Sequence, residues 1–299
     1  MRERISTDEA LETRSVLVTT PVVQLAWVTC HRAGRGLSCE EVKPEHEIAI
    51  PLRGANMRHV ESRTYTSCPS QVMLSNRGEP YRVSHPYGSG ESALQIVVRD
   101  DVLVELVATC DRDAVERPDR PFRARQIRPV LGMHLEAQLF MARAQSRTAL
   151  QLEEEVIAWL LRMLASVSEA PSASLASPRD FELVAQARAF LAAHYQRALR
   201  LDDVAQEVGI SVYHLCRVFR RVTGGTLWAE VQTLRSHAAL QHLAEDARDL
   251  TALALSLGYS QHSHFTASFR DELGMTPSAA RALLRQAPRR QRQRLAGAR

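Results

Sequence analysis

The chain has 299 residues, of which 45% are hydrophobic and 24% are charged, and its formal net charge is +4. These values are typical of a globular protein with up to two domains, and they exclude an intrinsically disordered chain. The sequence contains no run of about 18 apolar residues, the length needed to span a bilayer. The charged first ten residues lack the apolar stretch of a secretory signal.

The cysteines are odd in number and scattered. They are Cys30, Cys39, Cys68, Cys110 and Cys216, and no two of them form a C-x-x-C pair. This pattern indicates reduced thiols in a cytoplasmic protein and argues against a zinc site or a disulfide framework.

Short apolar runs rich in β-branched residues fill the region from Val16 to about Val98. Turn sequences such as Arg53-Gly54 and Asn76-Arg77-Gly78 separate them at strand-sized intervals, which predicts an antiparallel β-barrel or sandwich. After Pro129 the apolar residues recur at helical spacing, so we expect two helices, over residues 131–144 and 148–166, packed beside the strands.

A segment rich in Ser, Ala and Pro, residues 169–178, is typical of an interdomain linker. All apolar patterns beyond it are helical. We therefore expect a strand-rich domain over residues 1–168, a linker over 169–178, an all-α domain over 179–286 and a basic disordered tail over 287–299. The predicted helices of the all-α domain span residues 180–195, 201–208, 211–223, 227–244, 251–257, 261–273 and 277–284.

Charge differs between the two halves. Residues 179–299 contain 17 Arg and no Lys, against 11 acidic residues, whereas residues 1–178 contain 21 basic and 23 acidic residues. Arginine suits bidentate contacts to phosphate and guanine, so the basic half is the candidate for binding a polyanion.

The all-α region contains one short unit twice. The first copy runs from Val208 to Thr226 and the second from Leu257 to Pro277, and Gly209 and Gly258 lie 49 residues apart. Each copy has a Gly turn, a Ser and a helix bearing Phe-Arg. This repeat predicts two helix-turn-helix units that read neighbouring segments of the major groove.

The first predicted reading helix has two distinct faces. Leu215, Val218, Phe219 and Val222 recur with core spacing, and the opposite face carries the residues Tyr213, Cys216, Arg217 and Arg220. We expect Arg217 to contact a guanine and Arg220 and Arg221 to hold phosphates. An ordinary solvated arginine face is the alternative interpretation.

The second predicted reading helix has Phe265, Phe269 and Leu273 facing the core. Its outward set comprises His262, Ser263, Thr266, Ala267 and Arg270. This face is less basic than the first. A capping or packing role is an open alternative for His262 and the favoured interpretation for His264. The helix between the units, 18 residues at 1.5 Å each, is roughly 27 Å long and could hold the two reading helices about one DNA turn (~34 Å) apart.

Residues 181–284 resemble the DNA-binding domain of the AraC/XylS transcriptional regulators. The motifs that carry the resemblance are L-D-D-V-A-x-x-V-G-I-S-x-x-x-L-x-R-x-F-R-R-x-T-G at 201–224 and L-A-L-S-L-G-Y-S-Q-H-S-H-F-T-A-S-F-R-D-E-L-G-M-T-P-S-A-A-R at 253–281. The resemblance implies base contacts from Tyr213, Cys216 and Arg217 in the first unit and from His262, Ser263 and Thr266 in the second. Phosphate contacts are expected from Arg220, Arg221 and Arg270.

The sequence departs from the family pattern at one position of the second unit. The family commonly has F-x-R-x-F there, whereas Ala267 stands between Phe265 and Phe269. The resemblance also implies a cupin-like N-terminal domain that senses a small molecule or mediates dimerisation, with the helices at 131–144 and 148–166 as the dimer contact. The implied protein is an α+β transcription regulator, an activator that contacts promoter DNA and RNA polymerase, and it is neither an enzyme nor dependent on a cofactor.

Two other classes remain open. A cupin-like barrel could be a metal enzyme with His31, His46, His59, His85, Glu45 and Glu47 as available ligands, although the close H-x-H followed by Glu is absent. A His on a half-buried strand is more often a polar residue with a hydrogen-bond partner. The second class is an architectural protein that binds DNA without a ligand or sequence preference.

Overall fold

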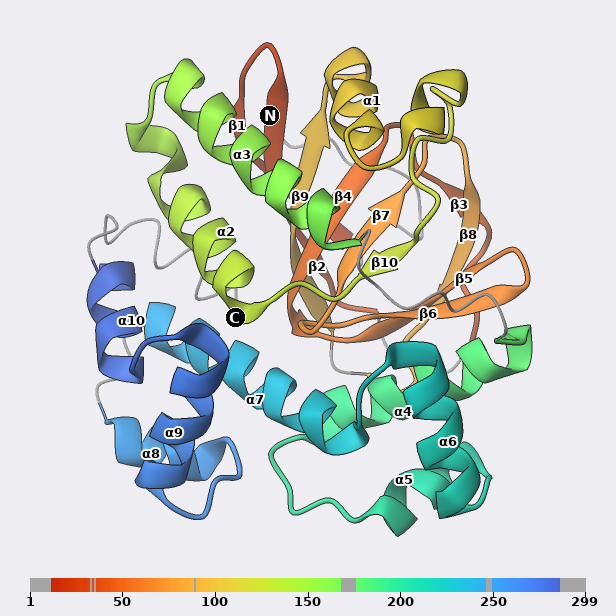
Figure 1. Cartoon of the computed structure of the whole chain (residues 1–299), viewed down its shortest axis with the longest axis vertical. Helices are drawn as coiled ribbons and strands as arrows, with labels where there is room; N and C mark the ends of the chain where they lie inside the picture. Colours follow the sequence, from red (N-terminus) through yellow and green to blue (C-terminus); the bar gives the residue numbers. More distant parts are fainter. Residues whose placement is uncertain are drawn as a thin grey trace.

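The computed structural model describes residues 12–32, 34, 36–88, 90–167, 176–245 and 249–285. It has an α+β architecture in which strands dominate the first 130 residues and helices the remainder. Figure 1 shows the sheets and α1–α3 in one half of the molecule and α4–α10 in the other. No helix in these ranges is long and apolar enough to cross a membrane.

Two antiparallel sheets form the strand-rich half. The six-stranded sheet has the order β1 (Glu12–Thr19), β2 (Val23–Cys30), β9 (Glu91–Val98), β4 (Glu47–Gly54), β7 (Val72–Ser75) and β10 (Gln126–Ile127). The four-stranded sheet has the order β3 (Glu41–Val42), β8 (Pro80–Ser84), β5 (Asn56–Val60) and β6 (Arg63–Ser67). Within the described residues no strand of one sheet pairs with a strand of the other, so the strands form two open sheets and not a closed barrel.

Gly54 makes the corner at which the chain leaves one sheet for the other. Its φ is +71°, and a Cβ built on it would lie 1.7 Å from the backbone oxygen of Gly90. Only glycine can combine this left-handed backbone with so close an approach. The predicted Arg53-Gly54 break is therefore a sharp turn from β4 into β5, a strand that the apolar pattern does not reveal.

Three helices cover one face of the six-stranded sheet: α1 (Asp100–Ala108), α2 (Leu131–Arg143) and α3 (Ala149–Val167). Their shared core contains Trp159, whose indole Nε1 donates to the backbone oxygen of Met133 at 2.9 Å. The predicted helices at 131–144 and 148–166 are confirmed within one residue. Helix α1 is not predicted, because Val102, Leu103 and Val104 extend the β-branched run of β9.

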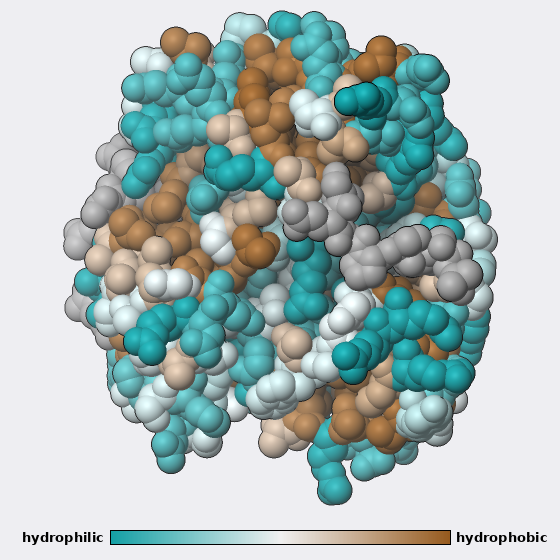
Figure 2. Space-filling view, in the orientation of Figure 1, coloured by the Kyte–Doolittle hydropathy of each residue, from teal (hydrophilic) through white to brown (hydrophobic). Residues whose placement is uncertain are grey.

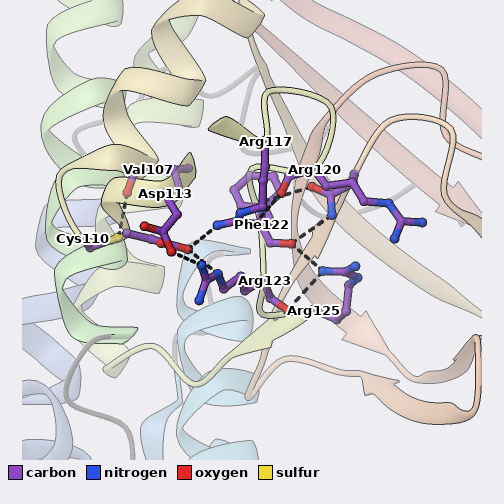
Figure 3. A network of polar contacts seen from close by, with 10 residues as sticks. Val107, Cys110, Asp113, Arg117, Arg120, Phe122, Arg123 and Arg125 are labelled. Atoms are coloured by element: carbon purple, nitrogen blue, oxygen red, sulfur yellow. Dashed lines mark hydrogen bonds and ion pairs between the residues drawn. The ribbon is translucent and has the colours of Figure 1, made fainter. Parts of the chain in front are cut away.

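A polar network fixes the segment between α1 and β10 to the sheet (Figure 3). The Asn76 side chain exchanges two hydrogen bonds, of 3.0 and 3.1 Å, with the backbone of buried Phe122. Arg117 and Arg123 lie 2.7 and 3.0 Å from the Asp111 carboxylate. This anchoring determines where the chain leaves β10 and hence where Arg128 lies.

The helical half contains α4 (Pro178–His194), α5 (Leu201–Val208), α6 (Val212–Thr223), α7 (Leu227–Ala244), α8 (Leu250–Ser256), α9 (His262–Leu273) and α10 (Pro277–Arg285). All seven predicted helices occur, with ends shifted by two residues at most. Their boundaries follow local signals, such as Ser211, which caps α6 by accepting from the His214 amide, and Gly209, which ends α5 at φ +74°.

The predicted linker overlaps α4 at its end. Ser177 and Asp180 form a capping box at the start of that helix and Pro178 is its first residue, so positions 177 and 178 are part of the helix and its cap. Most of the predicted linker, residues 169–175, and the predicted tail, residues 287–299, lie outside the described residues.

Candidate nucleic-acid interface

Helix α6 separates an apolar face from a polar one. Leu215, Val218 and Phe219 are buried in the core shared with α4, α5 and α7. On the other side Tyr213 is 76% exposed, and Arg217 and Arg220 are exposed as well. The division of faces predicted from the sequence is confirmed, and the aromatic ring and both guanidinium groups can reach an external partner.

Two of the predicted contact residues on α6 are less free. Cys216 is half-buried and packs against the apolar core. Arg221 pairs with the Asp180 carboxylate of α4 at 2.6 Å, although its side chain is still 38% exposed. Arg221 would therefore have to exchange or share this partner in order to hold a phosphate.

Helix α9 repeats the arrangement at the other end of the helical half. Phe265 and Phe269 are fully buried with ring centroids 5.7 Å apart, and His262, Ser263 and Arg270 are exposed. Thr266 is half-buried, and its hydroxyl is enclosed without a hydrogen-bond partner. In this conformation its hydroxyl is therefore not available to an external partner.

The favoured interpretation of His264 is wrong. This side chain is exposed and neither caps the helix nor packs into the core, because Phe265 and Phe269 take the inward positions of α9. His262 is exposed at the first position of the helix, with its ring centroid 6.4 Å from that of Phe265.

Helix α7 connects the two units. In Figure 1 it crosses the helical half, with α5 and α6 near one end and α8 and α9 near the other. The space-filling view in the same orientation shows mainly hydrophilic residues over the α8–α9 unit (Figure 2). Both candidate contact surfaces are thus accessible, and one helix joins them.

Buried Arg235 on α7 holds the two units together. Its guanidinium donates to the backbone oxygens of Tyr195 and Arg197 at 2.8 and 3.2 Å, and it lies over the Tyr259 ring at 5.3 Å. Gly258 makes this contact possible, since its φ is +84° and a Cβ would lie 2.4 Å from the Gln196 oxygen. The Gly that repeats Gly209 therefore serves the packing of the second unit on α4.

A second candidate site is a charged pocket between the two sheets. Its cavity, of about 40 Å³, has room for little more than one water molecule in this conformation. Most of its charged groups pair with one another, for example Lys43 with Glu47 at 3.1 Å and Arg32 with Glu41 at 2.7 Å. The lining residues are Glu12, Val28, Cys30, Arg32, Glu41, Lys43, Glu47, Ala49, Asn56, Arg58, Ser67, Tyr81, Val83, His85, Glu91, Ala93 and Gln95.

Several buried polar atoms of this pocket have no hydrogen-bond partner, among them Nε of Arg58, Oδ1 of Asn56 and Oε2 of Glu91. Burial raises the pKa of Glu91 to about 7, although Arg58 and Asn56 oppose that shift. Near neutral pH this carboxyl group can therefore donate or accept a hydrogen bond. The sequence reveals neither Arg58 nor Glu91 as a candidate, because both stand in ordinary polar positions of strand patterns.

Two of the four histidines considered as metal ligands, His46 and His59, have hydrogen-bond partners. His59 contacts the hydroxyls of Thr64 and Ser84 at 3.1 and 3.0 Å, and His46 Nδ1 accepts from the Arg77 amide at 3.1 Å. Among the described residues no three His, Cys, Asp or Glu side chains come together as a metal site would require.

Comparison with known proteins supports a DNA-binding role for the helical half. A helix-turn-helix domain family matches residues 204–283. Over about 100 residues the chain is 32% identical to the regulatory protein PocR of Salmonella typhimurium, 32% identical to the right origin-binding protein of Escherichia coli and 30% identical to the melibiose operon regulatory protein of E. coli. Each match covers 33–35% of this chain and 33–34% of the relative, so the chain spans about a third of these relatives.

Solved structures give similar matches. A transcriptional regulator with an AraC-type DNA-binding domain from Chromobacterium violaceum matches 35% of the chain and 94% of its own length, with 28% identity and a TM-score of 0.34. Apo ToxT of Vibrio cholerae covers 88% of the chain and 97% of its own length, with 12% identity and a TM-score of 0.37.

Proposed function

We propose that this chain, which belongs to the AraC/XylS family of transcriptional regulators through its C-terminal helix-turn-helix region, binds promoter DNA at specific sequences and activates transcription. The observation that carries the proposal is the pair of exposed helix faces, on α6 and α9, joined by α7 within the matched region. Each face has the composition and position of a reading helix in a helix-turn-helix unit.

The proposed contacts divide into base reading and phosphate binding. Tyr213, Cys216 and Arg217 on α6 and His262, Ser263 and Thr266 on α9 would face base edges. Arg220, Arg221 and Arg270 would hold phosphates and make the affinity dependent on salt. The structure favours Tyr213, Arg217, His262 and Ser263, whose side chains are exposed, over the half-buried Cys216 and Thr266.

We further propose that the strand-rich half, residues 1–168, is a sensing domain of the cupin-like type that binds a small polar molecule. The support is the pocket between the sheets, with its unpartnered Arg58, Asn56 and Glu91 atoms. The small cavity means that lining side chains must move to admit a molecule larger than water.

Dimerisation and activation complete the proposal. One face of α2 packs on α7 and α9, whereas α3 exposes Leu150 and Leu161, so α3 is the better dimer contact of the two helices. Activation would require contact with RNA polymerase in the cytoplasm. Another relative, AdaA of Bacillus subtilis, bears the name of a bifunctional transcriptional activator and DNA repair enzyme. For this chain we propose no catalytic step and no cofactor.

Selection of DNA by the purified full chain tests the function. Duplexes with a random central region are enriched over several rounds at about 150 mM salt, and binding is then measured against an unselected duplex. We expect a two-segment sequence bound about a thousandfold or more tighter than random DNA. Equal affinity for both duplexes would show an architectural binder and overturn the proposal.

A further inference from the structure

A fully buried carboxylate lies where the strand-rich half meets α7. Glu230, on the first turn of α7, has no exposed surface. Its Oε1 accepts from the Ser70 hydroxyl at 2.5 Å and lies 3.5 Å from Nε of Arg188. Its Oε2 lies 3.8 Å from a terminal nitrogen of Arg128. We call Ser70, Arg128, Arg188 and Glu230 the interface cluster; the first two belong to the strand-rich half and the others to the helical half.

The interface cluster is linked to both candidate reading helices. The Arg188 guanidinium lies 5.8 Å from the ring centroid of Phe219, the main core residue of α6. Arg128 also donates to the Thr233 hydroxyl at 3.0 Å, and that hydroxyl donates to the Glu272 carboxylate of α9 at 3.3 Å. A shift of Glu230 would thus reach α6 through one intervening side chain, Arg188. A shift of Arg128 would reach α9 through one intervening side chain, Thr233.

Gly225 gives independent evidence that Arg128 has a fitted position. A Cβ built on Gly225, in the turn between α6 and α7, would lie 3.0 Å from the Arg128 guanidinium. That is tighter than most side-chain contacts, so a side chain at position 225 would shift the end of the Arg128 guanidinium by a few tenths of an ångström. The turn that ends the first unit is therefore shaped around a side chain of the strand-rich half.

The same cluster continues into the charged pocket. Ser67, at the end of β6, lines the pocket, and Ser70 follows it by three residues. Between them Cys68 is fully buried in the core of the helical half, and the Thr66 hydroxyl donates to the Ala185 oxygen of α4 at 2.8 Å. Residues 66–70 thus connect the pocket wall to Glu230 through the short turn that follows β6.

The physics of the cluster fits a positioning role better than a stabilising one. A buried carboxylate is tolerated only where cations and donors surround it, and removing one partner leaves an uncompensated charge. Here Oε2 of Glu230 and Nε of Arg188 lack hydrogen bonds, so the pairing is incomplete. Such a cluster favours one docking geometry over others but adds little net stability.

We propose that Glu230, Arg128 and Ser70 are positioning residues that fix the strand-rich half on α7 and thereby set the angle between the two reading helices. The inference rests on the proposed DNA-binding function. Because Tyr213, Arg217, His262 and Ser263 are all exposed while the halves are docked, the cluster controls the orientation of the reading helices and does not cover them. Movement of residues 66–70 by a pocket ligand would alter that orientation.

The spacing of the operator tests the proposal. The wild-type chain first selects a two-segment sequence, and affinities are then measured with one or two base pairs inserted between the segments. Each inserted pair turns one segment by about 34° relative to the other, so a fixed pair of helices should lose affinity about tenfold or more. We expect Glu230→Gln to reduce that insertion penalty to about threefold or less. Glu182→Gln, in the exposed pair with Arg179, is the matched control and should keep the wild-type penalty.

Two further variants separate positioning from folding. Gly225→Ala shifts the Arg128 guanidinium without removing a charge and should also reduce the insertion penalty. This variant tests the positioning role of the interface cluster if Glu230→Gln does not fold. Arg128→Lys retains the charge and should restore the part of the penalty that Arg128→Ala loses. An unchanged insertion penalty in folded Glu230→Gln and Gly225→Ala overturns the positioning role and leaves the proposed DNA-binding function standing. A wild-type chain that selects no sequence overturns the proposed function and this inference with it.

Discussion

Arg217 is the residue at which the proposed reading of bases can be tested most directly. Its side chain is exposed on α6, and no ion pair joins it to the described part of the chain. A bidentate contact from arginine to guanine discriminates against other bases by about 1–3 kcal/mol.

We therefore expect Arg217→Ala to weaken operator binding by about 1–3 kcal/mol and to relax the preference at one base position. Fluorescence anisotropy with the selected duplex and its single-base variants measures both effects. Arg120→Ala, at an exposed position of the strand-rich half, is the control and should bind as the wild type does. A uniform loss across all sequences would instead assign Arg217 to a phosphate.

At the level of secondary-structure elements, α7 differs most from what its sequence pattern indicates. Leu227, Val231 and Leu234 are buried along one face, but Glu230, Thr233, Arg235, Ser236, His237 and Gln241 are buried too. Two polar faces of the helix are covered, because the strand-rich half and α4 pack against them.

Arg235→Met should destabilise the chain by about 3 kcal/mol, because the backbone oxygens of Tyr195 and Arg197 would lose their hydrogen-bond donor. Urea unfolding followed by circular dichroism measures the change. Arg179→Met, at an exposed position of α4, should change the free energy of unfolding by no more than about 0.5 kcal/mol. A similar small effect at Arg235 would mean that water replaces its contacts.

The sequence predicts the helices of the C-terminal half well because their ends carry local signals. Ser177, Ser211 and Thr226 cap helices, and Gly209 and Gly224 end them. The strand-rich half is predicted less completely. Strands β5 and β6 are short and rich in polar residues, and their pairing depends on contacts far away in the sequence.

The candidate sites follow the same rule. The reading faces on α6 and α9 arise from helical periodicity, which a sequence displays directly. The pocket and the interface cluster bring together residues up to 160 positions apart, such as Ser70 and Glu230. No local pattern marks Glu230 as buried, because only the docking of the two halves encloses it.

At the scale of the whole molecule, two buried histidines make the contact between the halves sensitive to acid. His134 of α2 and His237 of α7 have ring centroids 4.1 Å apart, and both nitrogens of His134 lack partners. Burial lowers the pKa of His134 to about 3 and that of His237 well below 6.5. Nearby Arg128 also lowers the pKa of His237, and only the Pro51 backbone favours the charged form of His134.

Since both pKa values are lowered on folding, the unfolded chain takes up protons below pH 6.5 that the folded chain does not. The stability is fully present above that pH and falls as the pH drops toward 3. We expect a loss of about 2 kcal/mol between pH 7 and pH 5.5. Urea unfolding at a series of pH values should show a smaller loss for His134→Leu/His237→Leu. Exposed His264→Gln is the control, and an equal loss in all three chains would assign the acid sensitivity to other groups.

Helix α7 is a structural member of both halves at once. It connects the two helix-turn-helix units. Its apolar side chains also pack against α2 and against Cys68 in the loop before β7. Neither half can therefore lose its order while the other keeps this helix intact. The chain should unfold as a single cooperative unit, and destabilisation of the strand-rich half should destabilise the helical half as well.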